Sequence, residues 1–557
     1  MQHAGVRCPV ERLWISSLTE ESIREGFRHL QPQSRFDSLN AAAEARANGD
    51  WLLGMNCTRL YSCKYSQPGR PLSVGRVQTP TLAMVVSRDY EIENFKPTAY
   101  WELQTTYKGV LFKWIGEYNS NNTWSLKDGK FKDEQEARRH LAVAKEHSFV
   151  ILSIEETKRQ DLPPQLYDLT SLQVDCNKIY GFSADQTLKT MQSLYEKKLA
   201  TYPRVDTRYL THDIYAHCPA ILARLQKYSK FIEPLKGKTL PKSSRIFDDS
   251  KVTDHHAIIP TGETNSQLSK EENMVYDLIC KRFVAVFYSP CQYSQTTVIA
   301  HSGPEAFRTI GRKVSNYGWK VLYMDDSIDE ENNNELEQTL PEFKKGESGT
   351  HKADIVRRMT TPPKRFTEAT LLQAMETAGK LVDDDELRDV LKENGIGRPS
   401  SRASIIENLY HRGYIIKSRK NVISTSTGRK LISVIQDRML TSPEMTGLWE
   451  KKLRMIEKGT FTKQKFMEEL TIQIREIVEG VKKDSTNTKI GVEGSMKSAG
   501  RVKLNKKAMT EKRYKMPASK LVGKTCPVCG KGIVRKGPYS YYCSEYKNGC
   551  RYKRPLD

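Results

Sequence analysis

The sequence of 557 residues has no long apolar run. No stretch approaches the roughly 18 apolar residues that a membrane-spanning helix needs. Near the start, Arg7, Glu11 and Arg12 interrupt the region where a secretory signal would be apolar. We therefore expect a soluble, cytoplasmic protein without a membrane partner. An internal repeat of solenoid length is also missing, and the length suits about three to four domains.

A complete phosphate-binding loop for ATP is missing as well. The nearest candidate, Gly523-Lys524-Thr525, would need a glycine at position 518, where the sequence has Ala518. The candidate also runs directly into Cys526. We therefore expect no use of ATP.

Cysteines are not arranged for disulfides. The total of eleven is odd, and no secretory signal accompanies it, which argues against a disulfide framework. Four of them form a Cys-x2-Cys pair and a Cys-x6-Cys pair separated by thirteen residues: Cys526, Cys529, Cys543 and Cys550. Four thiolates in a reducing compartment match a structural Zn²⁺ site, and so short a segment needs a metal to fold. Free surface thiols are the alternative.

Acidic residues are scarce toward the C-terminus. The formal net charge is +22, and residues 481–557 hold 20 Lys and Arg against 5 Asp and Glu, a net +15. Such a tail indicates a polyanionic partner, and nucleic acid is favoured over a merely solubilising role.

The order of sequence patterns predicts a multidomain protein that is mainly α with β. A β-rich domain interrupted by a helical insertion would bring the two flanking helical segments together in space. The expected parts are 8–95 (helical), 96–157 with 293–364 (β-rich), 158–292 (helical), 365–482 (helical), 483–519 (basic linker) and 520–557 (cysteine module).

Residues 186–210 contain the sharpest pattern. A helix is predicted over Gln186–Lys198, followed by an extended segment in which Tyr202, Arg204 and Asp206 alternate and so leave on one face. A phenol with a pKa near 10 is a poor nucleophile at neutral pH. A neighbouring guanidinium that holds a phosphate would assist it, and Asp206 would orient Arg204. An ordinary surface strand with an ion pair also fits this spacing.

Two adjacent histidines, His255 and His256, lie in the segment 253–261. Neighbours in an extended segment face opposite ways, and no further ligand is near, so a metal pair is disfavoured. A hydrogen-bonded structural histidine is the interpretation that the residues alone favour.

Two further segments carry arginines in or beside expected helices; the first could point backbone N–H groups at an anion, and an ordinary loop-to-helix transition is the alternative. In residues 72–82, a glycine turn precedes a helix expected to have Thr79 as N-cap and Pro80 as first residue, with Arg76 and Gln78 beside it. Upstream, Arg46 lies four residues before an aspartate in a helical stretch, a spacing that more often gives a surface ion pair.

Residues 395–407 begin with Gly-Ile-Gly-Arg-Pro-Ser-Ser. Ser400 or Ser401 is expected to cap a helix that runs to about Arg412. The stretches 414–417 and 422–424 then predict two strands of a wing, so this block is typical of a winged helix.

Taken in order, these segments resemble the type IA DNA topoisomerases, of the topoisomerase III kind, across roughly residues 10–480. Residues 201–207 are similar to the family's Thr-Tyr-Pro-Arg-Thr-Asp-Ser motif, except that Val205 and Thr207 replace its second Thr and its Ser. Residues 255–260 are similar to its His-x-Ala-Ile-x-Pro motif, and residues 73–78 to its Ser-x-Gly-Arg-Val-Gln segment.

The resemblance implies a torus-like core with winged-helix elements and a C-terminal zinc ribbon. It implies that the catalytic tyrosine attacks single-stranded DNA, forms a 5′-phosphotyrosyl bond, lets a strand pass and religates without ATP. The expected partners are single-stranded and negatively supercoiled DNA of a bacterial nucleoid or plasmid, and a monomer is expected. The implied catalytic residues are Tyr202, Arg204, Asp206 and His255, and the implied DNA-binding residues are Arg46, Arg76, Gln78, Arg398 and Ser400; Arg402 receives no role.

Members of this family begin with a Toprim domain that supplies a glutamate and an Asp-x-Asp pair holding Mg²⁺. No Asp-x-Asp pair precedes Tyr202, and residues 12–19 are similar to the segment that follows that domain. We therefore expect the Mg²⁺ ligands to lie outside these residues and strand passage by this chain alone to be impaired. The alternative is a single-stranded-DNA-binding remnant without strand passage. A tyrosine recombinase is more distant, because its tyrosine lies near the C-terminus and Tyr202 is central.

Overall fold

The computed structural model describes most of the chain as two compact units, Met1–Ser495 and Met496–Asp557. The described residues are 5, 8–15, 20–67, 71–118, 124–126, 129–252, 254–263, 267–324, 339–381, 395–486, 488–491, 522–526, 529–537, 540–545, 550 and 552–555. Among them, no helix combines the length and the apolar character that crossing a membrane requires. Most of the predicted basic linker lies outside the described residues.

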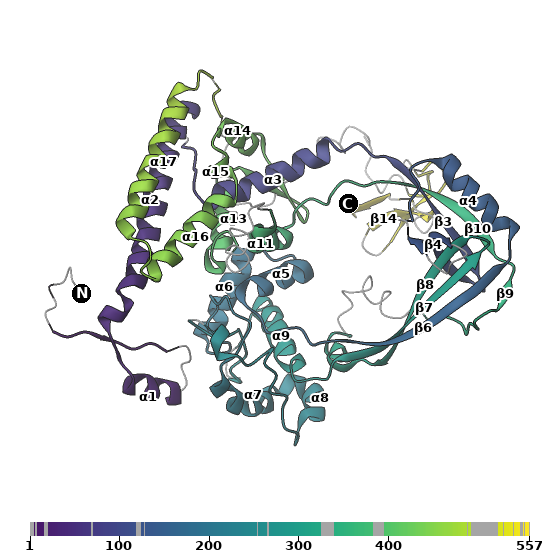
Figure 1. Cartoon of the computed structure of the whole chain (residues 1–557), viewed down its shortest axis with the longest axis horizontal. Coiled ribbons are helices and arrows are strands. Elements are labelled where there is room, and N and C mark those ends of the chain that lie inside the picture. The colour runs from purple at the N-terminus through teal and green to yellow at the C-terminus, as the bar shows by residue number, and fades with distance from the viewer. Residues whose placement is uncertain are drawn as a thin grey trace. The chain divides into compact units, whose positions relative to one another are not determined.

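The helical segments from the two ends of the first unit pack against each other. The long helix α2 (Asp37–Tyr65) contacts α16 (Glu444–Glu457) and α17 (Lys463–Lys483), and Figure 1 shows α2 and α17 side by side. Buried residues on α2 recur every three or four positions, which is the spacing of one helix face. Gly49 permits a close approach to α16 and α17, because a Cβ there would lie 3.0 Å from the Trp449 ring and 3.2 Å from the Phe466 ring. The expected meeting of these segments is observed.

A single sheet joins strands from before and after the helical insertion. Its strand order is β10-β3-β4-β8-β7-β6-β9, with β5 on β4. The strands are β3 (Ala99–Tyr107), β4 (Val110–Tyr118), β5 (Trp124–Leu126), β6 (Phe149–Asp161), β7 (Cys291–Ser302), β8 (Glu305–Asn316), β9 (Ser348–Gly349) and β10 (Lys352–Met359). Antiparallel pairing of β6 with β7 brings the two ends of the insertion together. Helix α4 (Glu134–Glu146) packs on this sheet.

The insertion is a helical bundle that contacts the C-terminal part of the first unit. Its helices are α5 (Leu169–Tyr180), α6 (Ala184–Glu196), α7 (Cys218–Arg224), α8 (Ser229–Ile232) and α9 (Lys270–Ala285). Helix α5 packs on α11 (Glu368–Glu376) and on α13 (Pro399–His411). After α13, β11 (Ile415–Ser418) and β12 (Asn421–Ser424) form the expected wing.

Two predicted helix starts are wrong. Helix α3 (Gln78–Glu93) begins before Pro80, and the Thr79 hydroxyl accepts the backbone N–H of Gly75 at 3.0 Å instead of capping the helix. Helix α13 has Arg398 as N-cap without a side-chain cap bond, and Ser400 and Ser401 lie in its first turn. Pro399 is the first residue of α13 and Pro80 the third of α3, and at both positions no N–H partner is required.

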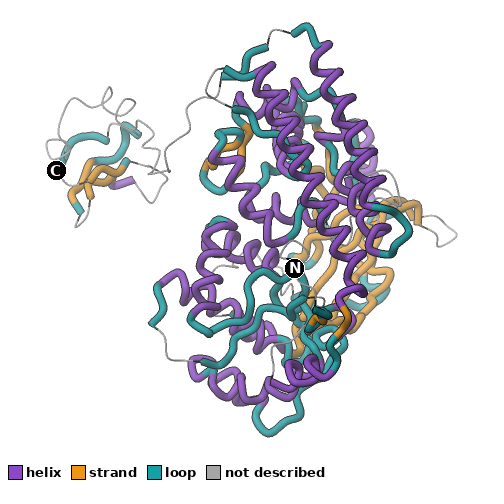
Figure 2. The backbone as a smooth tube through the Cα atoms, turned by 90° about the vertical axis from the view of Figure 1, so that its left-hand side faces the viewer, coloured by secondary structure: helices purple, strands orange, loops and turns teal. Residues whose placement is uncertain are grey.

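The remaining elements are small. In the first unit they are β1 (Glu11–Arg12), α1 (Glu20–Arg28), β2 (Gln31–Pro32), α14 (Ser426–Val434) and α15 (Arg438–Thr441). The second unit has a sheet of β13 (Val534–Lys536), β14 (Ser540–Cys543) and β15 (Lys553–Pro555), drawn in orange near the C-terminus in Figure 2. The mixture of helices and sheet agrees with the predicted fold class, while the torus and the domain boundaries stay predictions.

Candidate active site

The segment 202–207 alternates between exposed and buried side chains, as predicted. Arg204 and Asp206 are exposed and Tyr202 is half-buried, whereas Pro203, Val205 and Thr207 are buried. The segment is extended without being a strand, and its backbone bonds to neighbouring segments; for example, the N–H of Leu169, the first residue of α5, donates to the Val205 carbonyl at 3.1 Å. The buried residues thus anchor one face and leave the other open.

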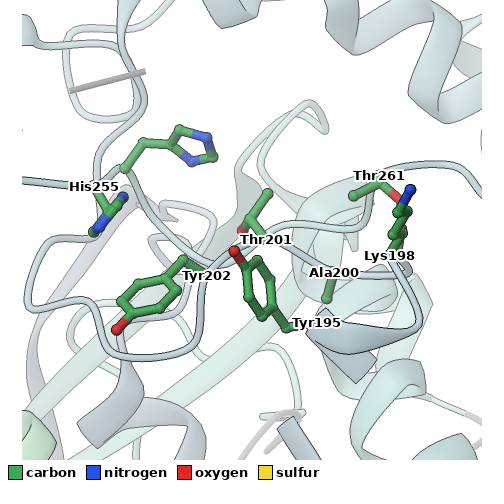
Figure 3. A pocket seen from close by; sticks show the side chains of 8 residues that line it. Tyr195, Lys198, Ala200, Thr201, Tyr202, His255 and Thr261 are labelled. Atoms are coloured by element: carbon green, nitrogen blue, oxygen red, sulfur yellow. The ribbon is translucent and has the colours of Figure 1, made fainter. Parts of the chain in front are cut away.

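A second segment, 254–261, lies along the tyrosine segment and carries His255 to it. Thr201 donates its N–H to the Ile259 carbonyl at 3.0 Å, and the Ala257 N–H donates to the Tyr209 carbonyl at 2.9 Å. These bonds place the rings of Tyr202 and His255 with centroids 4.5 Å apart (Figure 3). No described residue hydrogen-bonds to the Tyr202 hydroxyl or to the His255 ring.

His256 differs from His255 in its environment. Burial lowers the pKa of His256, and its Nδ1 lies 2.9 Å from its neighbour's carbonyl oxygen, at Ala257. The neutral ring therefore donates to the backbone. Both histidines line one pocket beside Tyr202, and the expectation that their side chains face opposite ways stays a prediction. The chain bends at Asp254 and His255 and so departs from the extended geometry on which that expectation relied.

Side chains from distant parts of the sequence line a pocket of about 440 Å³ at the tyrosine. Its lining includes six of the predicted site residues: Tyr202, Arg204, Asp206, His255, Arg398 and Ser400. Neither Arg204 nor Arg398 forms an ion pair with any residue that the structure describes, so both guanidiniums are available to an anion. The expected orientation of Arg204 by Asp206 is not present, since no ion pair joins them; Asp206 instead interacts electrostatically with Arg402.

Two glycines shape the wall that carries Arg398. Gly395 and Gly397 have φ values of +59° and +74°, a region that side chains rarely adopt. A Cβ on Gly395 would lie 2.3 Å from the Met375 carbonyl oxygen, and one on Gly397 would lie 2.9 Å from Val77. The turn therefore packs tightly between α11 and the loop before α3, which directs Arg398 into the pocket.

Arg402, to which the sequence assigned no role, joins the two walls. Its side chain is 2% exposed; Nε donates to the Gly397 carbonyl at 3.0 Å, and Nη1 donates to the Thr170 hydroxyl at 3.0 Å. Burial lowers its pKa, while Glu376, Asp168 and Asp206 oppose that shift. One buried guanidinium thus ties the glycine turn to the helix that packs behind the tyrosine segment. Its position in an amphipathic helix gave no indication of this.

Arg402→Ala is expected to lower the free energy of unfolding by about 3 kcal/mol, because buried carbonyl and carboxylate groups would lose their only cationic neighbour on this helix. Urea denaturation of the full chain, followed by tryptophan fluorescence, measures the change. Arg24→Ala is the control, since the Arg24 side chain is 70% exposed and pairs with Glu20 on its own helix. Equal effects of the two substitutions would contradict the assignment.

The other predicted DNA-binding residues lie outside this pocket. Arg46 pairs with Glu450 on α16, and Arg76 donates to Asp50 at 2.8 Å and stacks on the Trp449 ring at 4.8 Å. The side chain of Arg76 is buried, and the Nε2 of Gln78 is buried without a hydrogen bond to any residue that the structure describes. The arginine-aspartate pair expected within one helix is replaced by these pairs between elements, and contact with DNA stays a prediction for all three residues.

In the second unit, four sulfur atoms converge on one point. The Sγ atoms of Cys526, Cys529, Cys543 and Cys550 all lie within 4.8 Å of one another. Cys526 and Cys550 are 3.7 Å apart, and Cys529 and Cys543 are 3.6 Å apart. Four ligands at about 2.3 Å around a tetrahedral Zn²⁺ would stand about 3.8 Å apart. The four cysteines could therefore hold a metal ion such as zinc.

Comparison with known proteins agrees with this geometry. A family profile described as DNA topoisomerase matches residues 34–468. DNA topoisomerase 3 of a strain of Bacillus cereus is 36% identical over 540 residues, which is 94% of this chain and 68% of that protein. DNA topoisomerase 3 of Bacillus subtilis (strain 168) is 35% identical over 497 residues, covering 87% of this chain and 66% of that one.

A solved structure shows the same fold. Full-length topoisomerase I from Thermotoga maritima matches 98% of this chain and 80% of its own, with a TM-score of 0.61 and 22% sequence identity. The family match covers the tyrosine segment, both histidines and the glycine turn. The chain therefore belongs to the type IA DNA topoisomerases, a family of isomerases.

Proposed function

We propose that Tyr202 is the nucleophile that cleaves single-stranded DNA, and that the pocket around it holds the scissile phosphate. The observation that carries this proposal is the convergence on one pocket of the Tyr202 phenol, His255 and the guanidiniums of Arg204 and Arg398, which bond to no carboxylate among the described residues. Cations of this geometry bind phosphate oxygens and stabilise charge that develops on them.

The proposed reaction exchanges one phosphoester for another. The Tyr202 oxygen attacks phosphorus and loses its proton, a phosphorus–oxygen bond forms, and the bond from phosphorus to the 3′-oxygen breaks. The leaving 3′-oxygen takes up a proton and the DNA keeps a 5′-phosphotyrosyl link. Because this link conserves the energy of the phosphodiester, religation needs no ATP. Arg204 and His255 would stabilise the phosphoryl oxygens, and Arg398 with Ser400 would hold the strand.

No step of this reaction is assigned to Mg²⁺. Two carboxylates, of Asp206 and Asp254, line the pocket. In the part of the chain that the structure describes, only the cysteine cluster brings three or more His, Cys, Asp or Glu side chains into metal-binding distance. The residues described do not fit the expected Mg²⁺ site, and we propose that a Toprim segment supplies it. For the cysteine cluster we propose Zn²⁺.

The proposed substrate is single-stranded or negatively supercoiled DNA, bound by a monomer at a bacterial nucleoid or plasmid. The full chain is expected to bind single-stranded oligonucleotide at least about tenfold more tightly than blunt duplex, with affinity falling steeply as salt rises. Unpaired bases can stack on aromatic side chains, whereas the bases of a blunt duplex are already paired and stacked on one another. Fluorescence anisotropy at several fixed salt concentrations measures both affinities.

Equal affinity for the two DNAs at every salt concentration would show that the basic tail alone binds DNA. A second candidate function, single-strand binding without strand passage, is supported by the lack of fit to Mg²⁺ among the described residues. The two candidates differ in whether a covalent DNA adduct forms at Tyr202.

A further inference from the structure

A second pocket, of about 240 Å³, adjoins the phosphate pocket across Tyr202 and His255, which line both. Its other lining residues are Tyr195, Lys198, Ala200, Thr201, His256 and Thr261. Figure 3 shows Tyr195 and Lys198 on the side of Tyr202 away from His255. Tyr202 and His255 are thus shared by the two pockets and lie between them.

The walls of this pocket are apolar and its edge is cationic. The Tyr195 ring meets the Tyr202 ring edge-on, with centroids 5.5 Å apart, and no described residue bonds to the Tyr195 hydroxyl. Ala200 and the two threonines add methyl groups, while the threonine hydroxyls bond to backbone carbonyls. The wall formed by Tyr195, Ala200 and the two threonines is therefore apolar, and the cation lies at the edge.

Lys198 stands at the edge of the pocket in a constrained conformation. It follows the end of α6 with φ of +61°, which is uncommon for a lysine. Its carbonyl accepts the Thr261 hydroxyl at 2.5 Å, which fixes the turn. The ammonium is exposed and pairs with no carboxylate that the structure describes. A fixed turn that holds an unpaired cation beside an aromatic wall is suited to a nucleotide.

A metal ion and a large ligand fit this pocket poorly. Among the residues that line this pocket, only His255 and His256 carry metal-binding groups, and two ligands fall short of the three or more protein ligands of a typical site. The volume of about 240 Å³ is below the roughly 300–1,000 Å³ of pockets for drug-sized ligands, which suits one ring system.

We propose that this pocket binds one base of the cleaved DNA strand, the base next to the scissile phosphate, stacked on Tyr195, with a backbone phosphate on Lys198. This inference rests on the proposed function, because it requires the strand to cross the phosphate pocket. Neighbouring nucleotides of one strand are a single backbone step apart. The two pockets are also adjacent, because Tyr202 and His255 line both. The site fixes the position of the strand relative to Tyr202.

Photochemical crosslinking tests the stacking. Full chain is irradiated with single-stranded oligonucleotides that carry 5-iodouracil at one position each, because this base joins covalently to an aromatic ring stacked on it. Mass spectrometry is expected to find an adduct on Tyr195 for one position of the base. Adducts confined to peptides outside this pocket, from a chain that binds DNA, would overturn the inference and leave the proposed function standing. Absence of any DNA binding would overturn both.

Matched variants separate stacking from mere support of Tyr202. Tyr195→Ala is expected to weaken single-strand affinity about tenfold, and Tyr195→Phe to restore it, because the ring alone stacks. Removing the base that crosslinks, by an abasic site, should weaken binding of the wild-type chain and not of Tyr195→Ala. An equal loss in both chains would contradict the inference. Tyr100→Ala, in β3 of the sheet, is the control.

Lys198→Ala is expected to reduce the slope of log affinity against log salt by about 0.7, the value for one phosphate contact on a single strand. The control is Lys132→Ala, which removes an exposed lysine outside both pockets. An unchanged slope for Lys198→Ala would remove the phosphate contact from the inference.

Discussion

Tyr202→Phe is expected to abolish the covalent DNA adduct and to lower relaxation of supercoiled plasmid by at least about three orders of magnitude, because the attacking oxygen is lost. The experiment requires a competent background, in which a Toprim domain from a related enzyme is fused before Arg12 and Mg²⁺ is present. Denaturing gels of a labelled oligonucleotide detect the adduct, and agarose gels follow relaxation. The phenylalanine ring keeps the contact with His255, so single-strand affinity should change little.

Tyr100→Phe, in strand β3 of the sheet, is the matched control, because it removes a tyrosine hydroxyl that lies outside the site. An adduct that persists in Tyr202→Phe would assign the nucleophile to another residue. The unfused chain separates the two candidate functions, since we expect its relaxation to be negligible even in abundant Mg²⁺. Robust relaxation by it would show that residues of this chain supply the carboxylates.

The geometry of the nucleophile could be predicted because it is local. Alternation of apolar and polar residues from Tyr202 to Thr207 determines which side chains an extended segment buries, and the structure follows it. The wing after α13 and the four convergent sulfur atoms follow from short-range patterns in the same way. Their functional roles stay predictions, because geometry alone does not assign chemistry.

Pairings between distant residues could not be predicted. The expected pair of Arg46 with Asp50 is replaced because Glu450, about 400 residues away, lies closer to Arg46 once α16 packs on α2. Arg402 is similar: only the fold brings Thr170 and the glycine turn to its guanidinium. The predicted starts of α3 and α13 are wrong for a local reason. The hydroxyls of Thr79 and Ser401 bond to other backbone groups instead of capping the helices.

Electrostatics in the pocket also depends on the fold. Arg208 donates to Asp168 at 2.8 Å and approaches Glu376 at 3.7 Å, which joins the tyrosine segment to α11. Burial and the nearby Asp168 raise the pKa of Glu376, while Arg208 and Arg402 act to lower it. Arg208 thus has carboxylate partners outside the pocket, whereas Arg204 and Arg398 line the pocket and are available to an anion. The sequence shows how many arginines there are, but not which of them pair with carboxylates and which line the pocket.

Removal of the metal is expected to unfold the second unit while the first unit keeps its structure. Among its described residues, the small sheet β13–β15 buries Val534, Tyr541 and Tyr552 besides the cysteines, and a unit of this size needs a metal to supply its folding free energy. Backbone N–H groups of Gly532 and Lys531 lower the pKa of Cys529 to about 6, which favours the thiolate that Zn²⁺ binds.

The full chain is therefore expected to contain one Zn²⁺ per molecule by elemental analysis, and Cys543→Ser to contain close to none. In that variant, backbone amides of residues 522–545 should exchange with deuterium at the rate of an unfolded chain. Cys63→Ser is the control, because Cys63 is an exposed free cysteine of the first unit, and it should keep both the metal and the protection. A wild-type chain without zinc, or slow exchange in Cys543→Ser, would show that the four sulfur atoms gather without a metal. The sheet would then have to be stabilised by its tyrosine and valine packing alone.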